Sequence, residues 1–137
     1  MKKHLKIFVI LTFLGIILVG CKLTNDYYVK YEVLLDVTGW NLPDTAAVNS
    51  SFDIPVSLTI DNTCLSNPTF VLYKNSDSQY SVWGKAIFET HGEDCNKLSV
   101  GINVDSTINL KLTTVGKYYF YFLRQNAYIK DSIYIKP

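Results

Sequence analysis

The residues best suited to chemistry are gathered in one short stretch, His91-Gly92-Glu93-Asp94-Cys95, which holds an imidazole, two carboxylates and a thiol. A metal ion would need three or four such ligands converging at about 2.0 to 2.4 Å, and neighbours on one loop rarely converge without a second segment. A nucleophilic Cys95 would need its thiolate beside His91. We therefore predict a solvated turn with no metal ligand, no cofactor and no catalytic residue. A metal site and a cysteine nucleophile are the alternatives.

The N-terminal segment has the three-part layout of a secretory signal. Lys2, Lys3 and Lys6 give a positive start, residues 7–19 are almost uninterruptedly apolar, and the small Gly20 follows. The apolar run is shorter than the roughly 20 residues that a membrane-spanning helix needs. We therefore predict that residues 1–20 are a signal peptide, and a spanning anchor helix is the weaker reading.

The tetrapeptide Leu18-Val19-Gly20-Cys21 resembles the lipobox of bacterial lipoproteins. The resemblance implies that Cys21 is lipidated through its sulfur and becomes the first residue after cleavage. Two or three acyl chains anchor a protein stably, whereas one chain alone is marginal. Residues 21–26 are then a tether, the membrane is a partner through Cys21, and the protein belongs in the bacterial cell envelope. Lys22 in second place favours the outer membrane.

The number of cysteines in the chain, three, also supports the prediction that Cys21 is lipidated. An odd number of thiols is awkward in an oxidising compartment, but lipidation of Cys21 leaves Cys64 and Cys95 as an even pair. We predict a disulfide between Cys64 and Cys95. Two unpaired thiols are the alternative.

The balance of charge bears on the class of partner. The chain has 13 basic and 12 acidic residues, and three of its lysines leave with the signal, so the mature chain carries 10 against 12, about −2. Binding to nucleic acid would call for a basic patch that releases phosphate counterions. We therefore predict no nucleic-acid partner. A hydrophobic content of 48% supplies ample material for a folded core.

Short stretches of alternating apolar and polar residues predict strands along residues 27–137, which we expect to form one domain. The clearest is 52–61, where five apolar side chains fall on one face, although Pro55 points to an edge or a bulge. No stretch shows a long helical period. Turn signals separate the strands, and we expect turns at 39–48 and after residue 104. The pattern predicts an all-β sandwich of about seven to eight strands. The other expected strands are 27–40, 69–74, 80–90, 98–104, 108–112, 118–123 and 128–136.

The step Gly116-Lys117-Tyr118 resembles the approach to strand F of immunoglobulin-like domains, where a tyrosine hydroxyl caps the corner backbone. The resemblance implies an immunoglobulin-like antiparallel β-sandwich. Phe120 stands where that family often has a cysteine, so the usual intersheet disulfide is not expected. The chain also looks like small bacterial lipoproteins with one such domain, through 62–64 (Asn-Thr-Cys), Cys95 and 131–135 (Asp-Ser-Ile-Tyr-Ile).

Strand alternation predicts an aromatic surface near the C-terminus. If the side chains of Tyr118, Phe120 and Phe122 point inward, those of Tyr119 and Tyr121 point outward, and Tyr134 points outward on the last strand. Exposed tyrosines offer amphipathic contact area at low entropic cost. We predict a binding face for an envelope protein or glycan, made of Tyr119, Tyr121 and Tyr134. Cross-strand packing that only stiffens the sheet is the alternative.

Three tripeptides resemble the Asp-(Ser/Thr)-apolar acceptors of O-glycosylation in some double-membraned bacteria. They are 44–46 (Asp-Thr-Ala), 105–107 (Asp-Ser-Thr) and 131–133 (Asp-Ser-Ile). Thr45 and Ser106 lie in expected turns and are the better candidates.

The sequence carries no glycine-rich phosphate loop, no Ser-His-Asp order and no HExxH motif. Together with the lipobox this predicts a lipid-anchored, non-enzymatic binding or accessory module of the cell envelope. The alternative is a structural subunit of a surface assembly, in which a sheet edge pairs with a neighbour.

Overall fold

The computed structural model describes residues 27–92 and 95–137. The predicted signal peptide, the predicted lipid site at Cys21 and the predicted tether lie outside the described residues. The described fold consists of nine strands. Residues 27–92 and 95–137 form no helix that is long and apolar enough to span a bilayer. The strands are β1 (Tyr28–Leu35), β2 (Val37–Trp40), β3 (Thr45–Ala47), β4 (Ser51–Asn62), β5 (Leu65–Ser76), β6 (Gln79–His91), β7 (Lys97–Lys111), β8 (Gly116–Arg124) and β9 (Ala127–Lys136).

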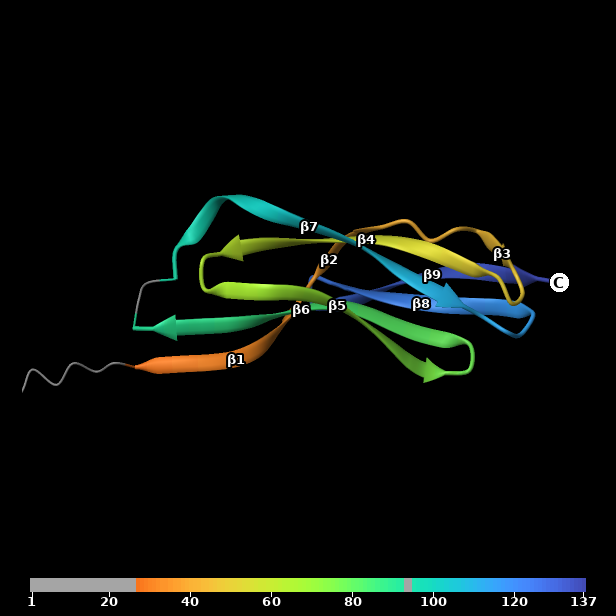
Figure 1. The fold of residues 1–137 in the computed structure, drawn as a ribbon, viewed down its shortest axis with the longest axis horizontal. Coiled ribbons are helices and arrows are strands. Elements are labelled where there is room, and N and C mark those ends of the chain that lie inside the picture. The colour runs from red at the N-terminus through yellow and green to blue at the C-terminus, as the bar shows by residue number, and fades with distance from the viewer. Residues whose placement is uncertain (1–26, 93–94) are drawn as a thin grey trace, which may run out of the picture.

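The strands form two sheets that pack face to face, so the predicted all-β sandwich is confirmed, with nine strands (Figure 1). The small sheet has the order β2-β4-β7. The large sheet has the order β1-β6-β8-β9-β3, and β5 pairs with the other edge of β6. Figure 1 shows an elongated molecule in which β1 begins at one end and the chain finishes at the other.

Strand β6 holds the large sheet together because it has different neighbours along its length. Its residues 79–82 pair in parallel with β8, and its residues 84–91 pair antiparallel with β1. Gly84 lies at the change of partner, where an added Cβ would meet Leu58 Cδ2 at 2.7 Å and Leu35 Cβ at 3.0 Å. A side chain at this position would have to displace the buried Leu58, so the close approach of the two sheets favours glycine here.

The core follows from the predicted alternation on β4 and β8. Ile54, Val56 and Leu58 are buried from the small sheet, and Phe120 and Phe122 are buried from the large one. Trp40 of strand β2 covers the core, because its indole ring is stacked on the ring of Phe122 with centroids 4.4 Å apart. The indole N–H of Trp40 donates to Asp131 Oδ2 at 3.0 Å, so this large side chain is packed and hydrogen-bonded at once.

The predicted tyrosine corner is present. The Tyr118 hydroxyl donates to the carbonyl oxygen of Thr114 at 3.1 Å, across the turn that leads into β8. Gly116 starts that strand with a φ of 146°, a value that L-residues rarely adopt. This corner is the feature that carried the resemblance to immunoglobulin-like domains.

The expected single strand 27–40 was wrong. The chain changes sheets at Asp36, so that β1 lies in the large sheet and β2 in the small one. The Asp36 carboxylate accepts a hydrogen bond from the backbone N–H of Gln125 at 2.9 Å, which ties the crossing point to the β8–β9 turn. Hydrophobic alternation continues through the crossing from Leu35 to Val37, so the pattern gave no sign of it.

Both expected turns contain strand residues. The region 39–48 includes β3, which pairs in parallel with β9. The expected break at Asp105 is absent, because β7 runs on and Asp105 Oδ1 accepts a hydrogen bond from Ser57 Oγ of β4 at 2.6 Å. Two parallel pairings, β3–β9 and β6–β8, therefore depart from the fully antiparallel expectation.

Pro55 lies in β4, the middle strand of the small sheet, yet close to a free edge. The last β2–β4 pair is Trp40 with Val56, and Asn41 then donates its N–H to the Pro55 carbonyl oxygen at 3.0 Å. The nitrogen and the carbonyl of one strand residue face the same neighbouring strand. The nitrogen of Pro55, which has no hydrogen to donate, therefore points toward the place where β2 has already ended. The predicted edge character therefore holds locally.

Candidate functional site

The outer face of the large sheet carries the three tyrosines that the sequence singled out. We name Tyr119, Tyr121 and Tyr134 the tyrosine face. Along β8 the buried Tyr118, Phe120 and Phe122 alternate with Tyr119 and Tyr121, which are partly buried. Tyr134 of β9 is 47% exposed. The structure therefore places all three on the side of the sheet away from the core, on adjacent strands.

Polar side chains surround the tyrosine face because of the strand register. Tyr119 lies opposite Ser132 of β9, Tyr121 lies opposite Lys130, and Tyr134 lies opposite Lys117. Facing residues in a ladder point to the same side of a sheet. The face therefore combines phenol rings with hydroxyl and ammonium groups.

Two lysine ammonium groups lie close to Tyr119. The Nζ of Lys130 is 3.8 Å from the ring centroid, and the Nζ of Lys117 is 5.6 Å from it. A cation near the electron-rich face of a ring is held by cation–π attraction. The ring and the two ammonium groups thus form a positively charged centre on the tyrosine face.

The sequence did not indicate that Tyr73 and Trp83 belong to the same surface. Tyr73 of β5 pairs with Ser81 of β6, and Ser81 pairs with Tyr121 of β8. Tyr73, Ser81 and Tyr121 therefore form one row across three strands. Tyr73 is 58% exposed, and its ring centroid is 6.2 Å from that of Trp83. Both aromatics were visible in the sequence, but only the β5–β6 and β6–β8 pairings show that they share a face.

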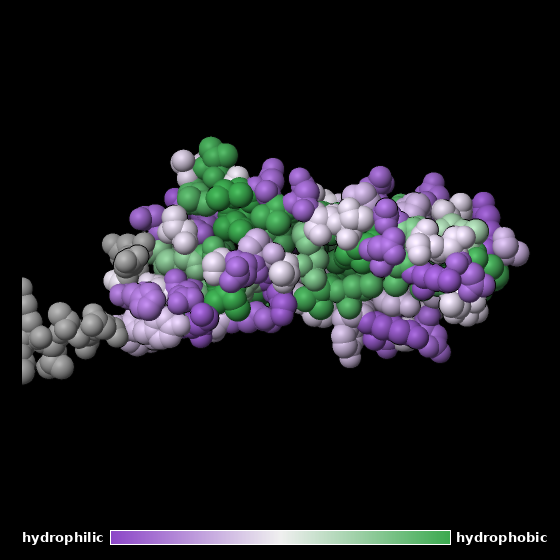
Figure 2. All heavy atoms as spheres, viewed as in Figure 1, coloured by the Kyte–Doolittle hydropathy of each residue, from purple (hydrophilic) through white to green (hydrophobic). Residues whose placement is uncertain are grey.

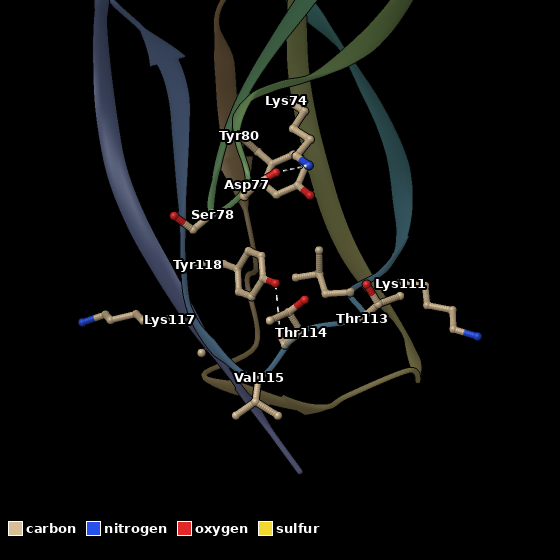
Figure 3. Close-up of a pocket in the computed structure, with 12 residues that line it drawn as sticks. Lys74, Asp77, Ser78, Tyr80, Lys111, Thr113, Thr114, Val115, Lys117 and Tyr118 are labelled. Atoms are coloured by element: carbon tan, nitrogen blue, oxygen red, sulfur yellow. Dashed lines mark hydrogen bonds and ion pairs between the residues drawn. The ribbon is translucent and has the colours of Figure 1, made fainter.

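A pocket of about 530 Å³ lies at the end of the sandwich, where the β5–β6 turn meets the connection from β7 to β8 (Figure 3). Tyr80 and Tyr118 lie deep within it, while Lys111 and Lys117 point away on opposite sides. Burial raises the pKa of Tyr80 above its usual range. The lining comprises residues 74, 77, 78, 80 and 111–118.

The rim of this pocket carries an ion pair, in which Lys74 Nζ lies 2.8 Å from Asp77 Oδ1. Their hydrogen bond and mutual attraction lower the pKa of Asp77 and raise the pKa of Lys74. Both groups are exposed, and such a pair contributes little to stability. The pocket is therefore polar at its rim and aromatic at its base.

The predicted disulfide is confirmed. Cys64 and Cys95 are joined, with Cα atoms 5.4 Å apart and a sequence separation of 31. Cys64 follows β4 and Cys95 precedes β7, so the bridge links two connections at the end of the sandwich where β1 begins (Figure 1).

Removing this bridge with Cys64→Ser and Cys95→Ser is expected to lower the free energy of unfolding by about 3 to 4 kcal/mol, because it releases a closed loop of that length. Urea unfolding of the oxidised parent and the double variant gives the difference. The parent after reduction is the control and should match the variant. A difference below about 1 kcal/mol would contradict the expected stabilisation.

His91 lies at the end of β6, where its ring centroid is 4.7 Å from that of Tyr28. Its Nε2 is 3.5 Å from Glu89 Oε1, and the hydrogen bond from Lys30 lowers the pKa of Glu89. Glu93 and Asp94 lie outside the described residues. Within residues 27–92 and 95–137, no three His, Cys, Asp or Glu side chains gather closely enough to hold a metal ion.

The two glycosylation candidates lie on strands rather than in the expected turns. Thr45 begins β3 opposite Tyr134, and Ser106 lies within β7 opposite Val56. Both residues are exposed. Each stays a prediction, with a surface position that a glycan could reach.

We compared the chain with protein-family models, with curated proteins and with solved structures. None of the three comparisons found a match.

Proposed function

We propose that this protein is a lipid-anchored binding module of the bacterial cell envelope, without enzymatic activity, which holds an envelope glycan or protein on the tyrosine face. The observation that supports the proposal most is the grouping of Tyr119, Tyr121 and Tyr134 on one outer sheet face, with Lys130 at 3.8 Å from the Tyr119 ring. Tyrosine supplies large contact area at low conformational cost, and therefore is frequent in binding surfaces.

The charges on this face favour an anionic ligand. Lys117 and Lys130 bring two ammonium groups beside Tyr119. Carboxylate or phosphate groups accept charge-assisted hydrogen bonds from such donors. An acidic glycan or an acidic protein surface fits this chemistry, with its rings or apolar groups against the tyrosines.

The anchor is the second part of the proposal. Leu18-Val19-Gly20-Cys21 supplies the lipid site, and Lys22 favours outer-membrane placement. A module held by its N-terminus leaves the whole outer face of the large sheet open to other envelope components. In this proposal the lipid holds the module at the membrane, and the tyrosine face binds the ligand.

The tyrosine face can be tested with the mature chain, residues 21–137, and isolated envelope material from the native host. Tyr119→Ala, Tyr121→Ala and Tyr134→Ala together should weaken sedimentation of the protein with that material by at least about tenfold, as expected for central aromatic contacts. Tyr31→Ala is the matched control, because Tyr31 is half exposed but lies on β1. Equal binding by the triple variant and the parent would refute this role.

A structural subunit of a surface assembly is the second candidate. Among the described residues, the far edges of β5 and β7 pair with no strand. Unpaired edges offer backbone hydrogen-bonding groups to a neighbouring chain. Self-association of the purified mature chain through these edges would favour this function, and a stable monomer would favour the binding module.

A further inference from the structure

We infer that the end of the sandwich at which β1 begins rests on the phospholipid surface, so that the domain is docked as well as tethered. The inference rests on the proposed lipid anchor at Cys21. It concerns four exposed side chains, Tyr27, Tyr28, Val100 and Ile102, which we name the tether-end patch. The partner is the headgroup layer and upper acyl region of the bilayer to which the lipid belongs.

The side chains of the tether-end patch are all at least half exposed. Val100 is 80% exposed, Tyr27 71%, Ile102 57% and Tyr28 50%. Figure 2 shows hydrophobic side chains gathered over the first part of β7 at this end of the molecule. Exposed apolar side chains that gather in one place, unlike those scattered singly, mark surfaces that meet a partner or a membrane.

Strand pairing brings the four residues to the same end. Tyr28 lies opposite His91, the last residue of β6, and Tyr27 precedes it. Lys97 begins β7 opposite Asn62, the last residue of β4, and Val100 and Ile102 follow on that strand. Both strands therefore start where β4 and β6 finish, as Figure 1 shows, and the disulfide closes the same end.

The length of the tether brings this end to the bilayer. Residues 21–26 separate the lipid site from the domain, and six residues span at most about 20 Å when fully extended. A leash this short raises the effective concentration of the patch at the membrane to the millimolar range or above. A weak preference for the interface is then enough to keep the patch docked.

The chemistry of the patch suits the interface. Tyrosine is enriched at membrane–water boundaries, where its ring meets the acyl region and its hydroxyl stays hydrated. Val100 and Ile102 supply aliphatic groups for the upper acyl layer. Lys97 is exposed at the start of the same strand and can face lipid phosphates. The pocket of Figure 3 is lined by the β5–β6 turn and the β7–β8 connection, at the opposite end in Figure 1, so docking in this orientation puts it farthest from the membrane.

The test attaches the lipid chemically, so that it does not depend on lipidation in the cell. In the mature chain, residues 21–137, Cys64 and Cys95 are bonded to each other, which leaves Cys21 as the one free thiol of three cysteines. Cys21 is coupled to a maleimide lipid in phosphatidylcholine vesicles with brominated acyl chains. Val100→Trp adds a fluorophore to the patch. Leu34→Trp adds a matched one at an exposed site farther along β1.

We expect the bromolipid to remove about half of the emission added by Val100→Trp, because interfacial side chains lie about 5 to 10 Å into the headgroup and acyl boundary. The emission added by Leu34→Trp should not change. Adding Tyr27→Ser, Tyr28→Ser and Ile102→Ser to Val100→Trp should restore its emission. Coupling Cys21 to a soluble maleimide instead of the lipid should abolish the quenching.

Equal quenching of Val100→Trp and Leu34→Trp, or none of either, would overturn docking. Either result would leave the anchor untouched, because the lipid was supplied chemically. The anchor is tested separately, by the intact mass of protein from the native host. A mass that shows no acyl chains on Cys21 would overturn the anchor. The two failures are therefore distinguishable.

Discussion

Replacing Cys21 with serine is expected to move the protein almost completely from the membrane fraction to the soluble fraction. The side chain of serine cannot form the thioether that carries the diacylglycerol, and each buried methylene contributes about 0.8 kcal/mol to membrane binding. The tether-end patch alone is too small to replace two or three acyl chains in membrane binding. Fractionation of cells that express Cys21→Ser, with immunoblotting of both fractions, gives the distribution.

The control for this variant is Thr24→Ala, which changes the tether and keeps the cysteine. It should stay with the membranes. Intact mass of the parent should show the chain beginning at Cys21 with acyl groups attached. Sedimentation of Cys21→Ser with the membranes, to the same extent as the parent, would contradict the lipid anchor.

Phe120→Ala should lower the free energy of unfolding by about 3 to 5 kcal/mol, the usual cost of emptying a buried aromatic site. Phe120 is 0% exposed, and its ring is stacked on Tyr80 with centroids 5.2 Å apart. It also lies near Phe122, at 6.4 Å. The cavity would therefore open between the aromatic side chains that join β6 to β8.

Urea unfolding of the oxidised protein measures this change, with the disulfide intact in every variant. Tyr134→Ala is the control from the same sheet, since its side chain is half exposed, and a change within about 1 kcal/mol is expected. A cost below about 1 kcal/mol for Phe120→Ala would contradict the central position of this ring in the core.

Local pattern predicted those parts of the fold in which one strand contains its own evidence. The alternation of 52–61 became β4 with its apolar side chains buried. Gly116-Lys117-Tyr118 became the tyrosine corner, because the hydroxyl of Tyr118 reaches only four residues back along the chain. The pairing of Cys64 with Cys95 followed from counting thiols rather than from geometry.

Contacts between strands distant in sequence were beyond such reasoning. The crossing at Asp36 interrupts no hydrophobic pattern, so β1 and β2 looked like one strand. The parallel β6–β8 pairing joins residues 40 apart, such as Gln79 and Tyr119. A three-residue strand such as β3 has too few residues for a period to be visible.

The candidate site shows the same division. Parity along one strand was enough to predict where Tyr119 and Tyr121 point. The ammonium of Lys130 was not predicted, because its place beside Tyr119 depends on the register of β8 and β9. That register is set by the two-residue turn at Gln125 and Asn126, with φ values of 51° and 60°, as in type I′ hairpins. The sequence there lacks the Asn-Gly signal of such turns.

The central claim, that the tyrosine face binds an envelope component, is tested most directly by photocrosslinking in native membranes. A photoreactive phenylalanine analogue is placed at position 121, and in a second protein at position 107, an exposed site on the β7 edge. We predict a discrete crosslinked product from position 121 that disappears with Tyr119→Ala and Tyr134→Ala, and none from position 107. A self-crosslinked dimer from position 107, with no product from position 121, would contradict the binding module and support the structural subunit.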